Sequence, residues 1–420
     1  MRHRGVPTLA GKKTAYQQER RRITPVSKEL RVALLTNFVP PYNIRMLEHL
    51  AACIGDFRVS VSTPMEAGRT WQPSWGHLQV NVEKTWTVGR RWSHEEAFTD
   101  DVSLHFPYST LLTLVKWRPE VIISAQFGFR TAQAALYRRI FPRSRLIVWA
   151  TLSERTERGR SRMRALQRRV LLNLADAALV NGVSGENYLK GLGMTQERIF
   201  RLPYCPEISQ FLDLPPTRGS TSARRFLYVG QLVERKGLFP FLAVLSDWCR
   251  KHQDVVCEFW IAGHGPLRSE LETAAVPPNL QRRLLGAIEY GNLSTVYAEA
   301  GILVFPTLAD EWGVVVNEAL AAGMPVLGSV YAEAVNEMIE DGKTGWTFCP
   351  DQPSSVYEAI DRSMACTVEQ LNDMRRVARQ RACCLSPKYG TRCFLEAINF
   401  ARGQTRSAQF VETLEVGEER

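Results

Sequence analysis

Two acidic side chains, Asp310 and Glu318, have seven residues between them in a segment that runs from an apolar stretch into a helical pattern. The apolar stretch Ile302–Phe305 predicts a buried strand, and Gly323 with Pro325 predicts the end of the helix. Open α/β sheets bind ligands beyond the carboxyl ends of their strands, which is where this segment places both acids. A carboxylate accepts two hydrogen bonds at once and therefore suits vicinal hydroxyls. The plainer alternative is that Asp310 only caps the helix and Glu318 is solvated.

The beginning of the predicted helix is a second chemical feature, formed by Trp312, Gly313, Val314 and Val315. Backbone N–H groups at this position lack helical partners, so they offer donors and a partial positive charge to an anion such as a diphosphate. Gly313 has no side chain that would obstruct the approach of the anion.

A basic loop follows the first predicted strand of the second half, Phe226–Val229. The loop runs from Gly230 to Gly237 and holds Arg235 and Lys236. Cations beside the carboxyl end of a strand can stabilise negative charge on a ligand. An isolated Arg-Lys-Gly sequence is usually a surface turn, and its position after a strand is what favours the functional interpretation.

A glycine-rich turn, Gly263-His264-Gly265, follows another predicted strand, Cys257–Ala262. Two glycines allow the backbone to pass close to a ligand. The third glycine of a dinucleotide-binding fingerprint is missing, which disfavours a dehydrogenase. His264 is more often a turn residue than a catalyst.

Together these segments resemble retaining glycosyltransferase family 4, whose members have the GT-B fold of two Rossmann-like domains. The resemblance is strong over residues 225–350 and moderate over residues 31–205. It implies catalytic roles for three residues: Asp310 near the hydroxyls of the donor sugar, Glu318 on the ribose, and Lys236 on the diphosphate. The donor-binding residues that it implies are Gly230, Arg235, Lys236, Gly263, Gly265, Trp312, Gly313, Val314, Val315 and Glu318.

The chain departs from the family pattern at two positions. Asp310 stands where Glu is usual, and Gln231 stands where many members have Arg, so Arg235 would supply that phosphate contact. The resemblance also implies front-face attack, in which a donor phosphate oxygen takes the proton of the acceptor and no dedicated base is needed. We expect no metal and no other cofactor, because the seven histidines and nine cysteines form no metal-ligand spacing.

Alternating strand and helix patterns predict an α/β fold with two doubly wound Rossmann-like domains that face each other across a cleft. We expect a basic, disordered arm at 1–30, an acceptor-binding domain at 31–205, a donor-binding domain at 206–385, a helix at 386–402 that returns to the first domain, and a tail at 403–420. Residues 64–110 have a weak pattern and are interpreted as loops. The other predicted strands are Arg31–Thr36, Phe57–Ser62, Glu120–Ser124, Arg145–Ala150, Ala177–Asn181, Arg283–Gly286, Val326–Gly328 and Trp346–Phe348.

Acceptor contacts are expected from the first domain. Asn37 and Tyr42 lie in a Pro-rich turn after the first predicted strand, and Glu154 with Arg155 follow a later strand end. The resemblance implies that the turn with Asn37 and Tyr42 faces the cleft. Glu154 and Arg155 can face it because they follow a strand end, although a plain surface loop is an equally good interpretation of these two.

The net charge of +10 is concentrated in the N-terminal arm and in the arginine-rich run from Arg138 to Arg169. This run is either a solvated helix face or a surface that meets anionic lipid or a diphosphate-bearing acceptor. Nucleic acid is disfavoured because no zinc finger, helix-turn-helix or aromatic-rich binding signature is found. No apolar run approaches the ~20 residues that span a bilayer, and the scattered cysteines suit a reducing compartment. We therefore expect a cytoplasmic protein, peripheral on the inner face of the membrane.

The sequence predicts a retaining glycosyltransferase that moves a hexose-type sugar from a nucleotide-sugar donor to a glycan or lipid-linked acceptor in polysaccharide or glycolipid biosynthesis. Two alternatives stay open. One is a nucleotide-sugar epimerase of the same architecture, and the other is a glycan- or membrane-binding module with a decayed donor site.

Overall fold

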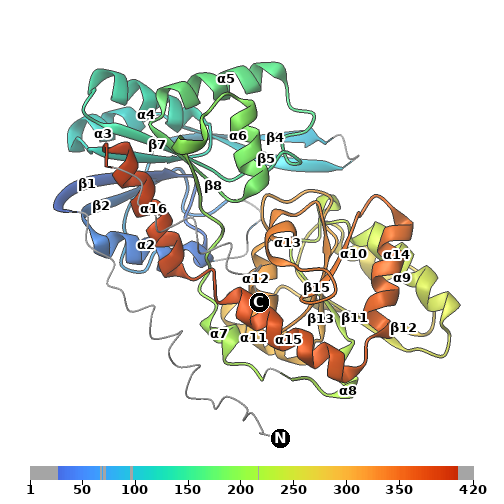
Figure 1. Cartoon of the computed structure of the whole chain (residues 1–420). Coiled ribbons are helices and arrows are strands. Elements are labelled where there is room, and N and C mark those ends of the chain that lie inside the picture. Colours follow the sequence, from blue (N-terminus) through green and yellow to red (C-terminus); the bar gives the residue numbers. More distant parts are fainter. Residues whose placement is uncertain (1–26, 67–68, 70–71, 95–97, 216, 405–420) are drawn as a thin grey trace, which may run out of the picture.

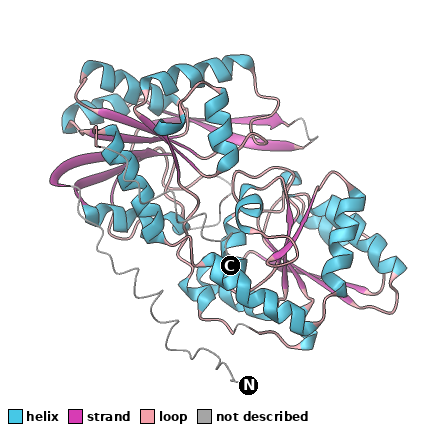
Figure 2. Cartoon of the chain, viewed as in Figure 1, coloured by secondary structure: helices cyan, strands magenta, loops and turns pink. Residues whose placement is uncertain are grey.

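The structure, a computed structural model, describes residues 27–66, 69, 72–94, 98–215 and 217–404. It consists of two α/β domains, each built around a parallel sheet that is covered by helices (Figures 1 and 2). The predicted fold class is therefore confirmed. The linker between the domains contains the short helices α7 (Ser209–Leu212) and α8 (Ser220–Ala223).

The first domain contains a seven-stranded parallel sheet in the order β3-β2-β1-β6-β7-β8-β9. Alternate residues of each strand point to opposite faces. Leu34 belongs to the core beneath α2 (Pro41–Cys53) and α16 (Pro387–Ala401), whereas Leu35 belongs to the core beneath the helices of the other face. These other helices are α3 (Thr110–Trp117), α4 (Phe129–Ile140), α5 (Arg162–Leu174) and α6 (Val183–Gly191). The strands are β1 (Ser27–Thr36), β2 (Ile54–Val61), β3 (Gln79–Val82), β6 (Val121–Ala125), β7 (Arg145–Ala150), β8 (Ala177–Val180) and β9 (Ile199–Arg201).

The first strand begins earlier than the sequence predicts. β1 begins at Ser27, so residues 27–30 belong to the sheet and not to the N-terminal arm. Leu30 is buried in the core, and Ser27 pairs with Ile54 across a register shift, which is why the apolar pattern alone did not reveal this extension. Residues 1–26 and 405–420, where we expected the rest of the arm and most of the tail, lie outside the described residues.

The sequence predicts loops at residues 64–110, but the structure contains strands there as well. Besides β3, this region contains β4 (Thr85–Ser93) and β5 (Thr99–Pro107), which form an antiparallel hairpin beside the main sheet. Nearly every residue of β4 is exposed. A strand that is solvated on both faces has no alternation of apolar and polar residues, so the usual signal for a strand is missing.

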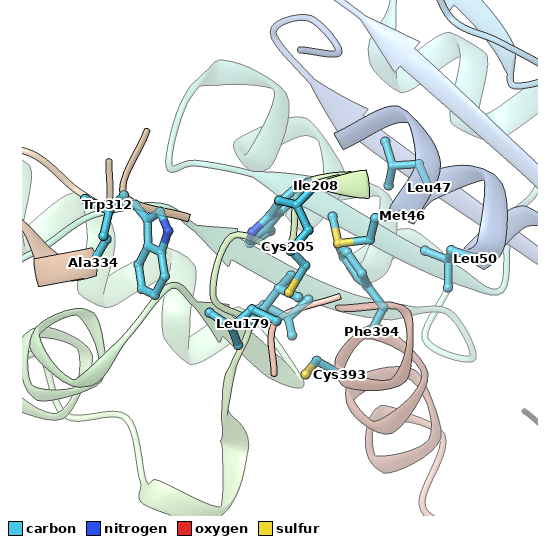
Figure 3. Packing of buried hydrophobic residues seen from close by; sticks show 14 of the residues in the cluster. Met46, Leu47, Leu50, Leu179, Cys205, Ile208, Trp312, Ala334, Cys393 and Phe394 are labelled. Carbon is cyan, nitrogen blue, oxygen red and sulfur yellow. The ribbon is translucent and has the colours of Figure 1, made fainter. Parts of the chain in front are cut away.

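The last helix crosses back to the first domain. α16 lies beside α2 (Figure 1), and the Thr391 hydroxyl donates a hydrogen bond to the Met46 carbonyl oxygen at 3.1 Å. Phe394 packs edge-on against Trp149 of β7, with ring centroids 5.1 Å apart. Figure 3 shows Phe394 among Met46 and Leu50, so the final helix completes the core of the first domain.

The second domain contains a six-stranded parallel sheet in the order β12-β11-β10-β13-β14-β15. The structure confirms the predicted bounds of three of its strands: β10 (Phe226–Val229), β11 (Cys257–Ala262) and β13 (Ile302–Phe305). The other strands are β12 (Leu280–Gly286), β14 (Val326–Ser329) and β15 (Gly345–Phe348). The helices are α9 (Leu238–Lys251), α10 (Arg268–Thr273), α11 (Leu293–Glu299), α12 (Val314–Ala321), α13 (Glu333–Met338), α14 (Pro353–Ala365) and α15 (Val368–Ala382).

A buried arginine of α15 fixes the unit β13–α12, which carries both acids of the sequence motif. The guanidinium of Arg375 is fully buried and donates to the carbonyl oxygens of Gly301 at 2.6 Å, Ala223 at 2.9 Å and Gly323 at 3.4 Å. Gly301 precedes β13 and Gly323 follows α12. One side chain therefore holds both ends of the unit.

Replacing Arg375 with Ala is expected to destabilise the protein by on the order of 3 kcal/mol, because several buried carbonyl oxygens lose a charged donor. Arg376→Ala is the matched control, since its neighbour Arg376 is exposed and pairs with Asp373 on the same helix. Urea denaturation of both variants measures the difference. Equal midpoints would show that Arg375 does not hold the unit together.

Candidate functional site

A pocket lies between the domains, at the carboxyl ends of β10, β11 and β13. The first domain and the linker contribute Tyr42, Arg69 and Tyr204 to its lining. Asp310 and every predicted donor-binding residue except Gly265 line it from the second domain, namely Gly230, Arg235, Lys236, Gly263, Trp312, Gly313, Val314, Val315 and Glu318. Segments far apart in the sequence thus meet at one site, as expected for parallel strands that share an edge.

The basic loop after β10 is held against the loop after β13. The loop contains a 3₁₀ turn, η3 (Glu234–Lys236), that ends at Gly237 in the left-handed conformation, with φ of 65°. A Cβ atom at Gly237 would lie 2.1 Å from the Pro306 carbonyl oxygen, so only glycine allows the two loops to approach this closely. The Leu308 N–H donates to the Arg235 carbonyl oxygen at 2.8 Å and closes the contact.

Lys236, Arg235 and Asp310 form a buried charge cluster at the pocket wall. The Lys236 ammonium pairs with the Asp310 carboxylate, and the Arg235 guanidinium lies 3.5 Å from the same oxygen and donates to the Ala309 carbonyl at 2.9 Å. Although burial opposes ionisation, the two cations hold the pKa of Asp310 below its ordinary value. Asp310 is therefore a carboxylate at neutral pH. Burial lowers the pKa of Lys236, and the charge of Asp310 opposes that shift.

Glu318 is a buried acid on α12, with a relative exposure of only 3%. Its carboxyl accepts a hydrogen bond from the Tyr297 hydroxyl at 2.9 Å. Burial raises the pKa of Glu318 to about 7, and the Tyr297 hydrogen bond limits that rise. An acid in this state can accept hydrogen bonds from ligand hydroxyls as a carboxylate at slightly alkaline pH.

The plainer alternative for the two acids is wrong. Asp310 does not cap α12, whose N-cap residue is Gly313. The Asp310 carboxylate accepts a long 3.4 Å contact from the Trp312 N–H, which precedes the helix. Glu318 is not solvated, as its exposure shows. Both side chains are instead buried where they line the pocket.

The remaining predicted residues lie elsewhere. Gly265 does not line the pocket; a Cβ atom there would lie 2.4 Å from the Leu232 carbonyl oxygen, so it packs two loops together. Asn37 accepts a hydrogen bond from the buried Arg130 and does not line the pocket. The family resemblance implied contacts for Asn37 and Gly265, but the presence of a matching turn after a strand does not fix the direction of the backbone beyond the strand.

Glu154 and Arg155 also lie outside the pocket. Glu154 is exposed, and its N–H donates to the Ser184 hydroxyl at 2.9 Å. Arg155 instead reaches the second domain: its guanidinium lies 3.1 Å from the ring centroid of Tyr331 and 3.9 Å from the carboxylate of Asp351. Arg155 therefore belongs to the contact between the domains, whereas the hydrogen bond of Glu154 stays within the first domain.

Several residues of the pocket wall, above all aromatic ones, are not predicted by the sequence. Tyr204 stacks on Trp312, with ring centroids 6.0 Å apart, and its ring centroid lies 5.7 Å from that of Tyr42. Tyr290 and Glu311 line the pocket as well. Tyr204 lies between two prolines of the predicted linker, a position that indicates a turn and carries no signal for binding.

The arginine-rich run is not one solvated face. Arg168 is buried, and its guanidinium pairs with Glu157 at 2.6 Å; Arg164 pairs with the same carboxylate at 3.4 Å. The guanidinium of Arg160 lies 3.2 Å from the ring centroid of Trp92. Tertiary contacts therefore engage these three arginines, so a contact of the run with lipid or acceptor would depend on its other members.

The described residues give no sign of a metal centre or of a membrane span. Residues 27–66, 69, 72–94, 98–215 and 217–404 contain no group of three or more His, Cys, Asp or Glu side chains that could hold a metal ion. Within the same part of the chain, none of the helices combines the length and the hydrophobicity that crossing a bilayer requires.

Comparison with protein families matches residues 216–381 to the model for glycosyl transferases group 1. The α-D-kanosaminyltransferase of Streptomyces kanamyceticus is 28% identical over 182 residues, which cover 40% of this chain and 45% of that protein. The glycogen synthase of Mycobacterium tuberculosis is 29% identical over 166 residues, which cover 39% of this chain and 39% of the synthase. The chain thus matches less than half of the length of these relatives.

Solved structures match over nearly the whole chain. Anabaena HepE in complex with UDP and glucose superposes with a TM-score of 0.63 at 13% identity and covers 88% of this chain and 100% of its own. The lipopolysaccharide outer core galactosyltransferase WaaB gives a TM-score of 0.64 at 11% identity. The match covers 88% of this chain and 99% of the WaaB chain. These similarities confirm that the chain has the GT-B fold, and residues 216–381 resemble the group 1 glycosyl transferases.

Proposed function

We propose that this protein is a retaining glycosyltransferase that takes a sugar from a nucleotide-sugar bound to the second domain and transfers it to an acceptor at the first domain. The observation that carries the proposal is the gathering of Asp310, Glu318, Lys236 and the N-terminus of α12 around one pocket between the domains. Support comes from HepE, a protein of the same fold whose complex contains UDP and glucose, and from relatives that are named as glycosyltransferases.

The donor is assigned to three parts of the pocket. Glu318 accepts hydrogen bonds from the ribose hydroxyls. Lys236, Arg235 and the N–H groups at the start of α12 bind the diphosphate, because this is where the pocket offers positive charge and free donors. Asp310 binds hydroxyls of the sugar, and its ion pair with Lys236 places the sugar next to the diphosphate.

The transfer follows from these positions. The bond between the anomeric carbon and the phosphate oxygen breaks, and Lys236 with Arg235 stabilises the negative charge that develops on the departing diphosphate. The acceptor hydroxyl attacks from the same face and passes its proton to a phosphate oxygen of the leaving group, so the configuration is retained. Tyr42 and Tyr204, which line the first-domain side, are the candidate contacts of the acceptor. We assign the acceptor to the glycans or lipid-linked sugars.

The most direct test incubates the full chain with a panel of nucleotide-sugars and follows thermal unfolding, since a bound donor raises apparent stability by mass action. A donor that stabilises the protein is then supplied with glycan and glycolipid acceptors, and nucleotide release is measured with and without them. Release that depends on the acceptor supports transfer. A nucleotide-sugar that is converted equally well without an acceptor would point to the epimerase alternative.

Replacing Glu318 with Gln tests the ribose contact and its pH dependence. In the parent, affinity for UDP should rise as pH increases through about 7, because the pKa of Glu318 is about 7 and the carboxylate is the stronger acceptor. Glu318→Gln should bind more weakly at pH 8 and lose this part of the slope. Calorimetry at several pH values measures both effects, and the difference between parent and variant cancels the titration of the diphosphate itself.

The same variant has a built-in folding control. Because the folded-state pKa of Glu318 lies above its ordinary value of 4.5, ionisation of Glu318 removes stability as pH rises towards about 7. Glu318→Gln avoids this loss and should unfold at the same or a higher temperature than the parent above pH 7. Unchanged UDP affinity in a stable variant would remove Glu318 from the site.

Replacing Lys236 with Ala should weaken UDP binding by roughly 10- to 100-fold, because a charge-assisted hydrogen bond to the diphosphate is lost. The matched control is Lys251→Ala, since Lys251 is exposed and pairs with Asp247 on the same helix. The variant Lys236→Ala with Asp310→Asn shows whether an unpaired Asp310 causes the effect. Parent-like UDP affinity in both Lys236 variants would mean that the diphosphate binds elsewhere.

Turnover is expected to persist in EDTA, because the positive charge at the proposed diphosphate site comes from Lys236, Arg235 and a helix N-terminus. The measurement is the initial rate with donor and acceptor in chelator and after addition of magnesium or manganese. Loss of activity in EDTA that either metal restores would show that a metal ion stabilises the leaving group.

A further inference from the structure

The helices α3, α4 and α5 expose an unusual number of large apolar side chains on the side that faces away from the sheet. We call this surface the outer helix face and define it by six residues: Leu112, Leu136, Ile140, Met163, Leu166 and Val170. All six are about half exposed or more, up to 80% for Met163. The helices contact one another in the order α3, α4, α5 and cover the same face of the first sheet (Figure 1).

The spacing of these residues shows that α5 has apolar stripes on two sides. Leu171 and Leu172 pack into the core, whereas Met163, Leu166 and Val170 follow one another at intervals of three and four and share the exposed side. Leu136 and Ile140 form the same kind of stripe on α4. Exposed apolar stripes on neighbouring helices of a folded chain point to an interaction site.

The charge of the same surface is of one sign. None of the three helices contains an Asp or a Glu. Lys116, Arg139, Arg162 and Arg169 are exposed among the apolar residues. The nearby acid Glu157 is engaged by Arg164 and Arg168, and Asp176 is engaged by Arg138. These acids pair with inner cations. Among the outer cations, Arg169 donates to the Leu192 carbonyl oxygen at 3.2 Å and remains exposed.

We propose that the outer helix face docks onto the surface of an anionic lipid bilayer. Apolar stripes flanked by Lys and Arg are the signature of helices that lie in a membrane interface, with the apolar side chains among the acyl chains and the cations at the headgroups. Because α3, α4 and α5 lie side by side, their exposed sides can contact the flat surface of a bilayer together. A protein partner fits less well, because the centres of protein interfaces are depleted of charge, whereas here cations alternate with apolar residues. At α4, Phe129 is also exposed and lies 6.0 Å from Phe106 of β5, which extends the face with aromatic rings.

Co-sedimentation of the full chain tests this surface with vesicles of phosphatidylcholine alone and of phosphatidylcholine mixed with phosphatidylglycerol. The parent should bind the anionic vesicles preferentially, and binding should weaken as salt is added. The variant Met163→Ser/Leu166→Ser/Val170→Ser should lose at least tenfold in vesicle affinity. Arg162→Gln/Arg169→Gln should lose affinity only for the anionic vesicles.

The matched control is Val256→Ser with Val377→Ser, two exposed apolar residues of the second domain, which should bind vesicles like the parent. All variants should keep the parent's affinity for UDP and its thermal stability, because the face lies away from the pocket residues. Hydrogen exchange should slow at 162–174 when vesicles are added, and not at 353–382. Parent-like vesicle binding by the serine variant would overturn the proposal. The proposal would also be wrong if the parent did not bind vesicles but formed a dimer that the serine variant loses. The outer helix face would then be an interface between two copies of this chain.

Discussion

The ion pair between Lys236 and Asp310 joins the two loops on which the pocket is built, one after β10 and one after β13. Removing two charges from water is costly, and each of them is tolerated only because the other is present. Arg235 adds a second positive charge beside the same carboxylate, and the neighbouring acid Glu311 lines the same pocket. The position of Asp310 therefore depends on the same residues that would hold a diphosphate.

The polar contacts behind the pocket fix its shape. Tyr297 holds Glu318 from α11, and Arg375 holds both ends of the β13–α12 unit from α15. Across the cleft, the N–H of Ser184 donates to Glu333 at 2.7 Å and the N–H of Val183 donates to Glu337 at 2.8 Å, so the N-terminus of α6 meets two acids of α13. The two domains are thus connected by directional hydrogen bonds close to the site. A change in the angle between the domains has to break these bonds.

Much of the second domain could be predicted from the sequence, because its strands are short apolar runs with turn residues at their ends. The bounds of β10, β11 and β13 were predictable for this reason, and the motifs after these strands were correctly expected to share one cleft. The hairpin β4–β5 was not predictable, because β4 is exposed on both faces and therefore lacks the alternation of apolar and polar residues that indicates a strand. The burial of Arg168 was not predictable either, because it depends on the ion pair with Glu157. No local feature of an arginine-rich helix reveals which arginine is buried. Tyr204 reaches the site only because the linker passes over Trp312.

The return of α16 to the first domain has a consequence for how the protein is made. Residues 27–215 emerge from the ribosome first, yet the core around Met46 and Trp149 lacks Phe394 until the last described helix has been synthesised. The second domain, whose sheet is continuous in sequence from β10 to β15, can complete its own core before that moment. Domains usually fold in the order of synthesis. In this chain the domain that begins first is finished last, because its core lacks the side chains of α16 throughout the synthesis of its neighbour.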